Sequence, residues 1–290
     1  MAVRFLRRGD SAYPPLLGQL HDPPLQLYLR GDASPALLAR PAVAIVGARS
    51  CSAYGAEVAR TLGRELAASG VVVVSGLARG IDGEAHRGAL DAQGPTLAVL
   101  GCGIDRDYPR SHADLARRVA AAGLIVSEYP PGVEPAPWRF PARNRIIAGL
   151  CLATVVVEAR ERSGALITAD FALELGREVF AVPGEITAAR SAGTNDLLRQ
   201  GAAPLLGVDD VLEALGLERA APAPTPVSPA GEAVLRVLAE EPRGADELAR
   251  ASGRASAEVA AVLVELELAG LVSEADGVYR CRSDRSILAR

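Results

Sequence analysis

The sequence predicts an α/β fold, in which helices cover both faces of a mostly parallel sheet, followed by a small C-terminal domain. Over residues 42–216, short continuous apolar runs alternate with amphipathic stretches. That alternation is typical of buried parallel strands joined by helices. A segment rich in proline and alanine then precedes a tail with helical periodicity. The 290 residues are enough for one large and one small domain.

The elements follow in order along the chain. Residues 1–40, rich in proline and leucine, are expected to form an ordered lead-in packed on the sheet. Strands are predicted at 42–46, 71–75, 96–100, 124–127, 154–159 and 178–182. Helices are predicted at 53–68, 82–91, 111–122 and 165–175, and a short strand at 203–206 with a helix at 208–216 closes the domain of 41–216. Ligands of such sheets bind beyond the carboxyl ends of the strands.

Residues 217–229 alternate proline with small residues and are expected to be an extended linker. Residues 230–290 then show three helical segments and a hairpin that turns at Asp276 and Gly277, an order typical of a winged helix. Its third helix carries Glu258, Glu265 and Glu267 and no basic residue. Because phosphates repel carboxylates, a protein contact or a structural role is expected for this helix rather than duplex reading.

The composition limits the classes of function. Hydrophobic residues make up 49% of the chain and aromatic residues 4%, so the core is aliphatic. The net charge of −4 means that any site for a polyanion is local. All 31 basic residues are arginines, which coding bias explains. Of these, Arg280, Arg282 and Arg285 follow the hairpin turn and could contact a nucleic acid. The four cysteines and three histidines lack zinc-site spacing, so no metal is expected.

The chain also carries no sign of export or of membrane insertion. No apolar run approaches the roughly 20 residues of a membrane span, and the first ten residues lack a signal-peptide pattern. A cytoplasmic protein with reduced thiols is therefore predicted.

Residues 137–184 hold the most informative combination: an arginine-rich turn, a strand, a Ser-Gly turn that opens a helix, and a second strand. Arg143 and Arg145 supply guanidinium groups that suit phosphate oxygens. Phe140 adds an aromatic face for a base, although a ring before proline is often buried. Ser163 and Gly164 lie where helix amides would hold an anion. An anion-binding edge is therefore predicted, without a catalytic pair.

Two further strand-to-helix junctions contribute. In VGARSCSAYG a dinucleotide fingerprint would need glycine at Arg49 and Ser52, so no nucleotide cofactor is expected and Arg49 is interpreted as a phosphate ligand. In SGLARGIDGEAHRGAL, Arg79 and Gly80 lie in a glycine-rich turn before a helix, with Asp82 as the expected N-cap.

Two more residues stay open between a structural and a binding role. His86 has no nearby nucleophile and is expected to pack or to hydrogen-bond a phosphate. Tyr108 either stacks on a base or packs in its turn.

Together with LGCGIDRDYP and FPARNRIIAG, these motifs resemble the DNA-processing protein A (DprA) family over residues 13–206. The resemblance implies an extended Rossmann-like, non-catalytic, single-stranded-DNA-binding domain that loads the RecA recombinase in natural transformation, with SSB as a further possible partner. It favours Arg143 and Asn144 as ligands, then Arg145. It also implies a homodimer, with Leu197, Leu198 and the following strand at the interface. Many family members carry an additional helical domain before this region, which is not expected here.

Two rival functions remain at this point. The first is a nucleotide-processing enzyme resembling the LOG-type phosphoribohydrolases, whose PGGxGTxxE motif is not matched by SGALITADFALE. The second is an adaptor that contacts RecA or SSB through the acidic tail without touching DNA.

Overall fold

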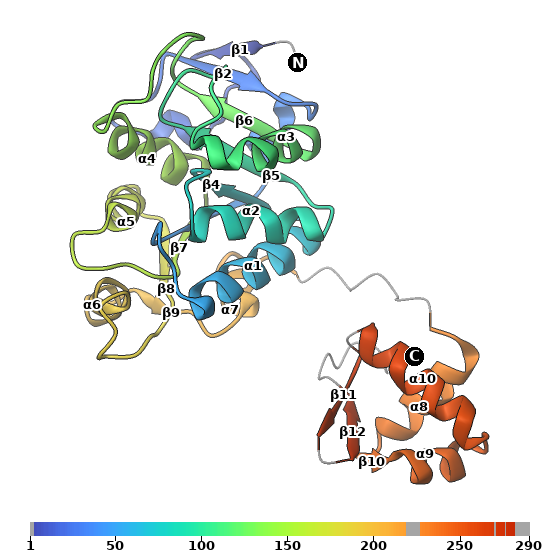
Figure 1. Ribbon diagram of the computed structural model, residues 1–290. Helices are drawn as coiled ribbons and strands as arrows, with labels where there is room; N and C mark the ends of the chain where they lie inside the picture. Colours follow the sequence, from blue (N-terminus) through green and yellow to red (C-terminus); the bar gives the residue numbers. More distant parts are fainter. Residues whose placement is uncertain (1–2, 219–226, 270, 276, 282–290) are drawn as a thin grey trace. The chain divides into compact units, whose positions relative to one another are not determined.

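The computed structural model describes residues 3–218, 227–269, 271–275 and 277–281 (Figure 1). The chain forms two compact units, Met1–Ala220 and Ala221–Arg290, each of which has its own apolar core.

The first unit is built on a nine-stranded sheet with the order β1-β2-β6-β5-β4-β3-β7-β8-β9. Strands β3 to β9 are mutually parallel, whereas β2 pairs antiparallel with β6 and β1 antiparallel with β2, so the lead-in extends the sheet. The predicted mostly parallel sheet is confirmed. The strands are β1 Arg4–Arg7, β2 Gln26–Arg30, β3 Ala42–Val46, β4 Val72–Ser75, β5 Thr96–Leu100, β6 Leu124–Ser127, β7 Ala153–Val156, β8 Glu178–Ala181 and β9 Ala203–Pro204.

Helices cover both faces of this sheet, because alternate strand residues point to opposite sides. Val43 and Ile45 face one core and Ala44 and Val46 the other. One face carries α1 Ala53–Ala68, α2 Ile81–Asp91, α3 Ala113–Ala122 and α7 Val208–Ala214. The other carries α4 Arg139–Leu150, α5 Gly164–Glu174 and α6 Ala192–Arg199, together with the short 3₁₀ turns Leu17–Gln19 and Pro35–Ala39. A third 3₁₀ turn, Arg110–His112, leads into α3.

One prediction about local structure is wrong. The segment described above as an arginine-rich turn is the first half of α4, which begins at Arg139. The run RNRIIAGL buries Ile146, Ile147 and Leu150 against the sheet, and this burial favours a helix over a turn.

The chain order creates a switch point at the centre of the sheet. After β3 the chain builds β4, β5 and β6 on one side, then returns to place β7 on the other side of β3. Helix α1, which follows β3, and helix α5, which follows β7, lie on opposite faces. The loops after β3 and β7 therefore diverge, and such a divergence opens a crevice at the carboxyl ends of the strands.

Helices α1 and α2 pack backbone to backbone through glycines. A Cβ atom on Gly63 would lie 2.3 Å from the Ala85 carbonyl oxygen, and one on Gly88 would lie 2.0 Å from that of Arg60. This close approach fixes how α2 lies against α1.

The second unit contains α8 Pro229–Leu238, α9 Ala245–Ser252 and α10 Ser256–Leu268. Its sheet has the order β10-β12-β11, from β10 Arg243–Gly244, β11 Val272–Ala275 and β12 Val278–Cys281. Three helices and a hairpin are the predicted winged-helix elements, and they are confirmed. Glu258, Glu265 and Glu267 of α10 are exposed. Asp276, Arg282 and Arg285 lie outside the described residues.

Candidate nucleic-acid interface

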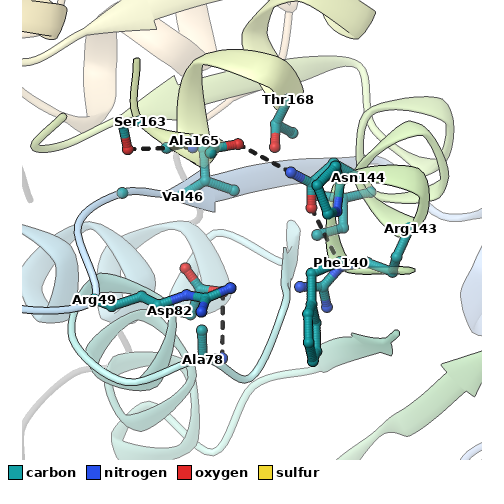
Figure 2. A pocket seen from close by; sticks show the side chains of 14 residues that line it. Val46, Arg49, Ala78, Asp82, Phe140, Arg143, Asn144, Ser163, Ala165 and Thr168 are labelled. Atoms are coloured by element: carbon teal, nitrogen blue, oxygen red, sulfur yellow. Dashed lines mark hydrogen bonds between the residues drawn. The ribbon is translucent and has the colours of Figure 1, made fainter. Parts of the chain in front are cut away.

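A pocket of about 200 Å³ lies at the switch point, where the carboxyl ends of β3 and β4 meet the starts of α4 and α5. Figure 2 shows Arg49, Asp82 and Phe140 on one side of it and the start of α5, with Ser163 and Ala165, on the other. A second pocket of about 210 Å³ lies between the loops after β4 and β5 and contains Arg79, Tyr108 and Arg110. Arg49, Ala78, Phe140 and Arg143 line both pockets, so the two adjoin, and together they are called the groove.

Arg49 and Arg79 are exposed and are brought together by Gly80. Gly80 has φ +74, and a Cβ there would lie 2.2 Å from the Ala48 carbonyl oxygen. The loop after β4 can therefore lie directly against the loop after β3, with Ile81 donating its amide to the Ala48 oxygen at 3.2 Å. Gly80 serves this packing. Among the described residues, neither arginine forms an ion pair.

Arg143 is 4% exposed, and its guanidinium lies at the ends of two strands. Nη1 donates to the carbonyl oxygens of Gly76 (2.9 Å) and Val99, and Nε donates to Asn144 Oδ1 at 3.3 Å. Burial lowers the Arg143 pKa to about 10, against the opposing effect of Asp82. The group thus carries a positive charge at neutral pH. The Arg143 guanidinium forms part of the groove floor, and its Nη1 is already hydrogen-bonded to two backbone carbonyls.

Asp82 is not the N-cap of α2, contrary to the prediction: Gly80 holds that position. The buried Asp82 carboxylate instead accepts from the amides of Gly76 (3.1 Å) and Ala78 (3.3 Å) and so fixes the loop before the helix. Burial raises the Asp82 pKa, while the Arg143 charge acts in the opposite sense. The Asp82 and Arg143 charges act on each other, and each favours the ionised form of the other.

The start of α5 forms the opposite wall. Ser163 caps the helix, its Oγ accepting from the Ala165 amide at 3.3 Å, and Gly164 is exposed with open space around its Cα. Asn144 donates from Nδ2 to the Gly164 carbonyl at 3.0 Å. The buried Asn144 side chain therefore links Arg143 to the α5 start rather than pointing freely into the groove.

Phe140 is half-buried and divides the two pockets. Its ring stacks on Tyr108 with centroids 5.2 Å apart, and the Arg49 guanidinium carbon lies 5.4 Å from its centroid. The ring also packs on Gly101, where a Cβ would lie 2.9 Å from Phe140 Cδ1. Arg49, Phe140 and Tyr108 together form a partly exposed surface that offers both a cation and aromatic faces. The pairing of Tyr108 with Phe140, 32 positions apart in sequence, could not be foreseen from local patterns.

Arg145 lies away from the groove and lines neither pocket. Its guanidinium holds Glu128 through two bonds of 2.6 and 3.0 Å and donates to the Asp22 carbonyl at 3.2 Å. These contacts join α4 to the lead-in and to the loop after β6. The guanidinium is already paired with a carboxylate, which does not favour the expected ligand role, and that role stays a prediction.

Leu197 and Leu198, the residues expected at a dimer interface, lie in α6, and their part in a dimer stays a prediction. Leu197 is 6% exposed and packs in the core of its own unit, while Leu198 is half-buried against the same core. Helix α6 follows Ser191, and its first polar side chains are held within the unit. Thr194 donates to the Ser191 carbonyl, and Asn195 holds both backbone groups of Gly184.

At the start of α1, a carboxylate of the protein sits where a dinucleotide fold would hold a pyrophosphate. Glu158 Oε2 accepts from the Ser52 amide at 2.9 Å, and Oε1 accepts from the Ser52 hydroxyl. A Cβ on Gly55 would lie 2.5 Å from Glu158 Cδ, so the carboxylate packs directly on the helix. The start of α1 is therefore occupied by the protein's own Glu158 carboxylate, whereas the start of α5 is open to an anion.

His86 is fully buried and lies outside the groove. Thr96 Oγ1 donates to the Val73 carbonyl at 2.8 Å, so the 2.7 Å contact between Thr96 Oγ1 and His86 Nδ1 requires a proton on Nδ1. Burial lowers the His86 pKa to about 3, which makes the ring neutral at physiological pH. Of its two expected roles, packing fits this position and a phosphate contact does not.

Within residues 3–218 and the described parts of 227–281, no cluster of histidine, cysteine and acidic side chains is suited to a metal ion. No described helix is both long and apolar enough to cross a membrane.

Comparison with known proteins gives consistent matches over both units. The family model of DNA recombination-mediator protein A matches residues 4–216, and that of the DprA winged helix domain matches residues 218–277. The chain is 47% identical over 266 residues to the putative DNA processing protein DprA of Mycobacterium tuberculosis H37Rv, covering 89% of this chain and 68% of that protein. It is 42% identical over 279 residues to Protein Smf of Escherichia coli K12, covering 92% and 74%.

Solved structures agree. DNA processing protein A from Streptococcus pneumoniae superposes with a TM-score of 0.69 at 41% identity, covering 75% of each chain. A structure describing the single-stranded DNA binding mode of the Helicobacter pylori protein gives a TM-score of 0.67 at 32% identity, covering 74% of this chain and 96% of that one. With both units matched in order, the chain belongs to the DNA recombination-mediator protein A family, the DprA/Smf group of DNA processing proteins.

Proposed function

We propose that this protein binds single-stranded DNA in the groove at the carboxyl edge of its sheet and acts as a non-catalytic recombination mediator. The observation that carries the proposal is the convergence of Arg49, Arg79 and the open α5 start on one groove with an aromatic wall. Cations for the backbone and ring faces for the bases are what sequence-tolerant binding of single strands requires.

The residues divide into two roles. Arg49 and Arg79, exposed and without ion pairs among the described residues, contact phosphates, as does the helix start at Ser163 and Gly164. Phe140 supplies the stacking face. Arg143 and Asn144 shape the floor, and the Arg143 charge adds to the positive potential there. A rigid floor of this kind lowers the ordering cost of binding.

Family membership supports the wider role. The relatives are named as DNA processing proteins, and the Helicobacter pylori relative is described as binding single-stranded DNA. On this basis the proposal includes protection of incoming DNA and loading of RecA in natural transformation, with SSB as a further partner and the cytoplasm as the place of action.

The proposal retains a homodimer, but through the edge of the sheet rather than through Leu197. Among the described residues, strand β9 pairs only with β8, and the following Leu206 is 82% exposed. Strand β9 has two residues and includes Pro204, which has no amide hydrogen to donate, so a second copy would contact this edge through the exposed Leu206 rather than by extending the sheet. A dimer would align two grooves and lengthen the bound strand.

The decisive experiment is a fluorescence-anisotropy titration of a labelled oligo(dT) with the intact chain and with Arg49→Gln/Arg79→Gln. Each lost charge-assisted bond is worth about 1.5–3 kcal/mol, so the variant is expected to bind at least tenfold more weakly. The matched control is Arg64→Gln, an exposed arginine in the second half of α1, far along the helix from the groove. Equal affinity of the wild type and the double variant would refute the groove.

Two rivals are tested alongside. An adaptor that does not touch DNA predicts that Arg49→Gln/Arg79→Gln leaves RecA loading unchanged, whereas the proposal predicts loss of both binding and loading. A nucleotide hydrolase predicts release of free base from a nucleoside monophosphate. No feature of the described groove favours that chemistry, and no release is expected.

A further inference from the structure

The arginines at the carboxyl edge of the sheet follow the spatial order of the strands. The loops after β5, β4, β3, β7 and β8, neighbours in that order, each carry arginine: Arg110, Arg79, Arg49, Arg160 with Arg162, and Arg190. All are exposed except Arg190, which is half-buried and donates from Nε to the Ser50 carbonyl at 2.9 Å.

These side chains are largely free of counterions. Among the described residues, Arg110, Arg160 and Arg162 form no ion pair or hydrogen bond through their side chains. Arginines at other places, such as Arg30, Arg60 and Arg145, are held by carboxylates at 2.6 to 2.8 Å. A row of unpaired cations creates a positive electrostatic potential, and this potential attracts an anionic ligand.

The acidic groups of the same loops do not cancel the row. Glu158 is buried on Ser52, and Asp105 and Asp107 are paired with Arg106 and Arg30. Exposed carboxylates remain at Glu161 and Glu185. The arginines of these loops therefore outnumber the free acidic side chains.

We propose that the bound strand crosses the sheet edge at right angles to the strands, from the loop after β5 to the loop after β7, and that Arg160 and Arg162 hold its phosphates beyond Arg49. The proposal rests on the proposed function and adds to it a direction and a second phosphate site. The two pockets already join the loops after β5, β4 and β3 to the α5 start. Arg160 and Arg162 lie immediately before that start.

The size of the row agrees with a short stretch of nucleic acid. Three strand spacings separate β5 from β7, about 14 Å at ~4.8 Å each. At the ~3.4 Å rise of a stacked strand this distance accommodates about four nucleotides. From β5 to β3 the row spans only two strand spacings, which accommodate about three nucleotides. An oligonucleotide of that length can bind Arg110, Arg79 and Arg49 without reaching Arg160 and Arg162, whereas a longer one engages the whole row.

The test compares Arg160→Gln/Arg162→Gln with the wild type and with Arg64→Gln, using oligo(dT) of about three and about twelve nucleotides. For the longer oligonucleotide the double variant is expected to bind severalfold more weakly. The slope of log K against log salt should fall by about 1.4, because each single-strand phosphate contact contributes about 0.7. For the short oligonucleotide the affinity should stay within about twofold, since Arg49, Arg79 and Arg110 remain.

Three outcomes would overturn the inference: unchanged affinity and slope at both lengths, an equal loss at both lengths, or the same loss in Arg64→Gln. The proposed function fails separately, if the wild type does not bind oligo(dT) or if Arg49→Gln/Arg79→Gln binds as tightly as the wild type. Arg162 has φ +61, a conformation that asparagine tolerates well. Arg160→Gln/Arg162→Asn is therefore the second variant, with circular dichroism confirming that its fold is intact.

Discussion

Arg143 and Arg49 have the same side chain and line the same groove, yet their surroundings assign them different tasks. Arg143 is 4% exposed and bonded to strand-end carbonyls. Arg49 is exposed, forms no ion pair among the described residues and lies over the Phe140 ring. A sequence pattern identifies both side chains as cationic. It does not show which of the two is buried and hydrogen-bonded to the backbone. The same limit applies to Arg145, whose partner Glu128 lies 17 positions away.

This difference predicts opposite phenotypes. Arg143→Gln removes buried charge-assisted bonds and leaves carbonyl oxygens unpaired, so it should lower the free energy of unfolding by about 3 kcal/mol. Arg49→Gln should change it by less than about 0.5 kcal/mol, as expected for an exposed site. Urea denaturation of both variants measures these values. A stable Arg143→Gln protein would show that its bonds do not hold the strand ends.

His86 predicts a pH dependence of stability. Its pKa is about 3 in the folded chain against 6.5 unfolded, so the unfolded state binds the proton more tightly. The contribution of His86 to stability is thus fully present above pH 6.5 and is lost as the pH falls towards 3. Asp82, with a raised pKa, acts in the opposite direction as the pH rises above 3.8. NMR titration of the folded protein should show no His86 protonation near pH 6; protonation there would contradict the buried neutral ring.

At the scale of elements, periodicity and turn residues predicted most of the fold. The helix 53–68 and the strands 42–46, 96–100 and 124–127 have the predicted bounds. The pattern predicts a turn at the start of α4, because this segment is rich in arginine and proline and the buried face of the helix begins only at Arg143. The packing of α1 on α2 could not be predicted either. Glycine has a low helix propensity, so in a sequence it indicates an unstable helix, and its role in close packing is seen only when the neighbouring helix is known.

That packing gives a stability prediction. Gly88→Ala would place a methyl group against the Arg60 carbonyl, which should cost about 1–3 kcal/mol through overpacking despite the better helix propensity of alanine. Gly18→Ala, where nothing lies within 4 Å, is the matched control and should be nearly neutral. Thermal unfolding of the two proteins measures the contrast. Equal midpoints would mean that the helices can separate without cost.

At the scale of the whole molecule, the cations that the proposed function needs all belong to the first unit, and the exposed face of α10 in the second is acidic. The net charge of −4 hides this division. The sequence predicted the acidic helix directly, because charge within one helix is local information. It also predicted that Arg49, Arg79 and Ser163 share one edge of the sheet, because parallel strands place their carboxyl ends together. It could not predict how the loops pack there, such as Phe140 against Tyr108.

A chain ending at residue 218 is therefore expected to bind oligo(dT) within about threefold of the full chain, because the phosphate contacts that set affinity are retained. Circular dichroism confirms that the shortened chain is folded. A loss of tenfold or more in a folded fragment would assign part of the DNA surface to the winged helix.

The groove is proposed to hold the flexible backbone of a single strand. A titration of the intact chain with single- and double-stranded oligonucleotides of one sequence, at about 50 and about 200 mM salt, tests this directly. With phosphate contacts by the four arginines Arg49, Arg79, Arg160 and Arg162, single-strand affinity is predicted to fall about fiftyfold between these salt concentrations, at a slope of about 0.7 per contact. Duplex binding should be much weaker at both. Comparable affinity for the two forms, or affinity independent of salt, would contradict the account.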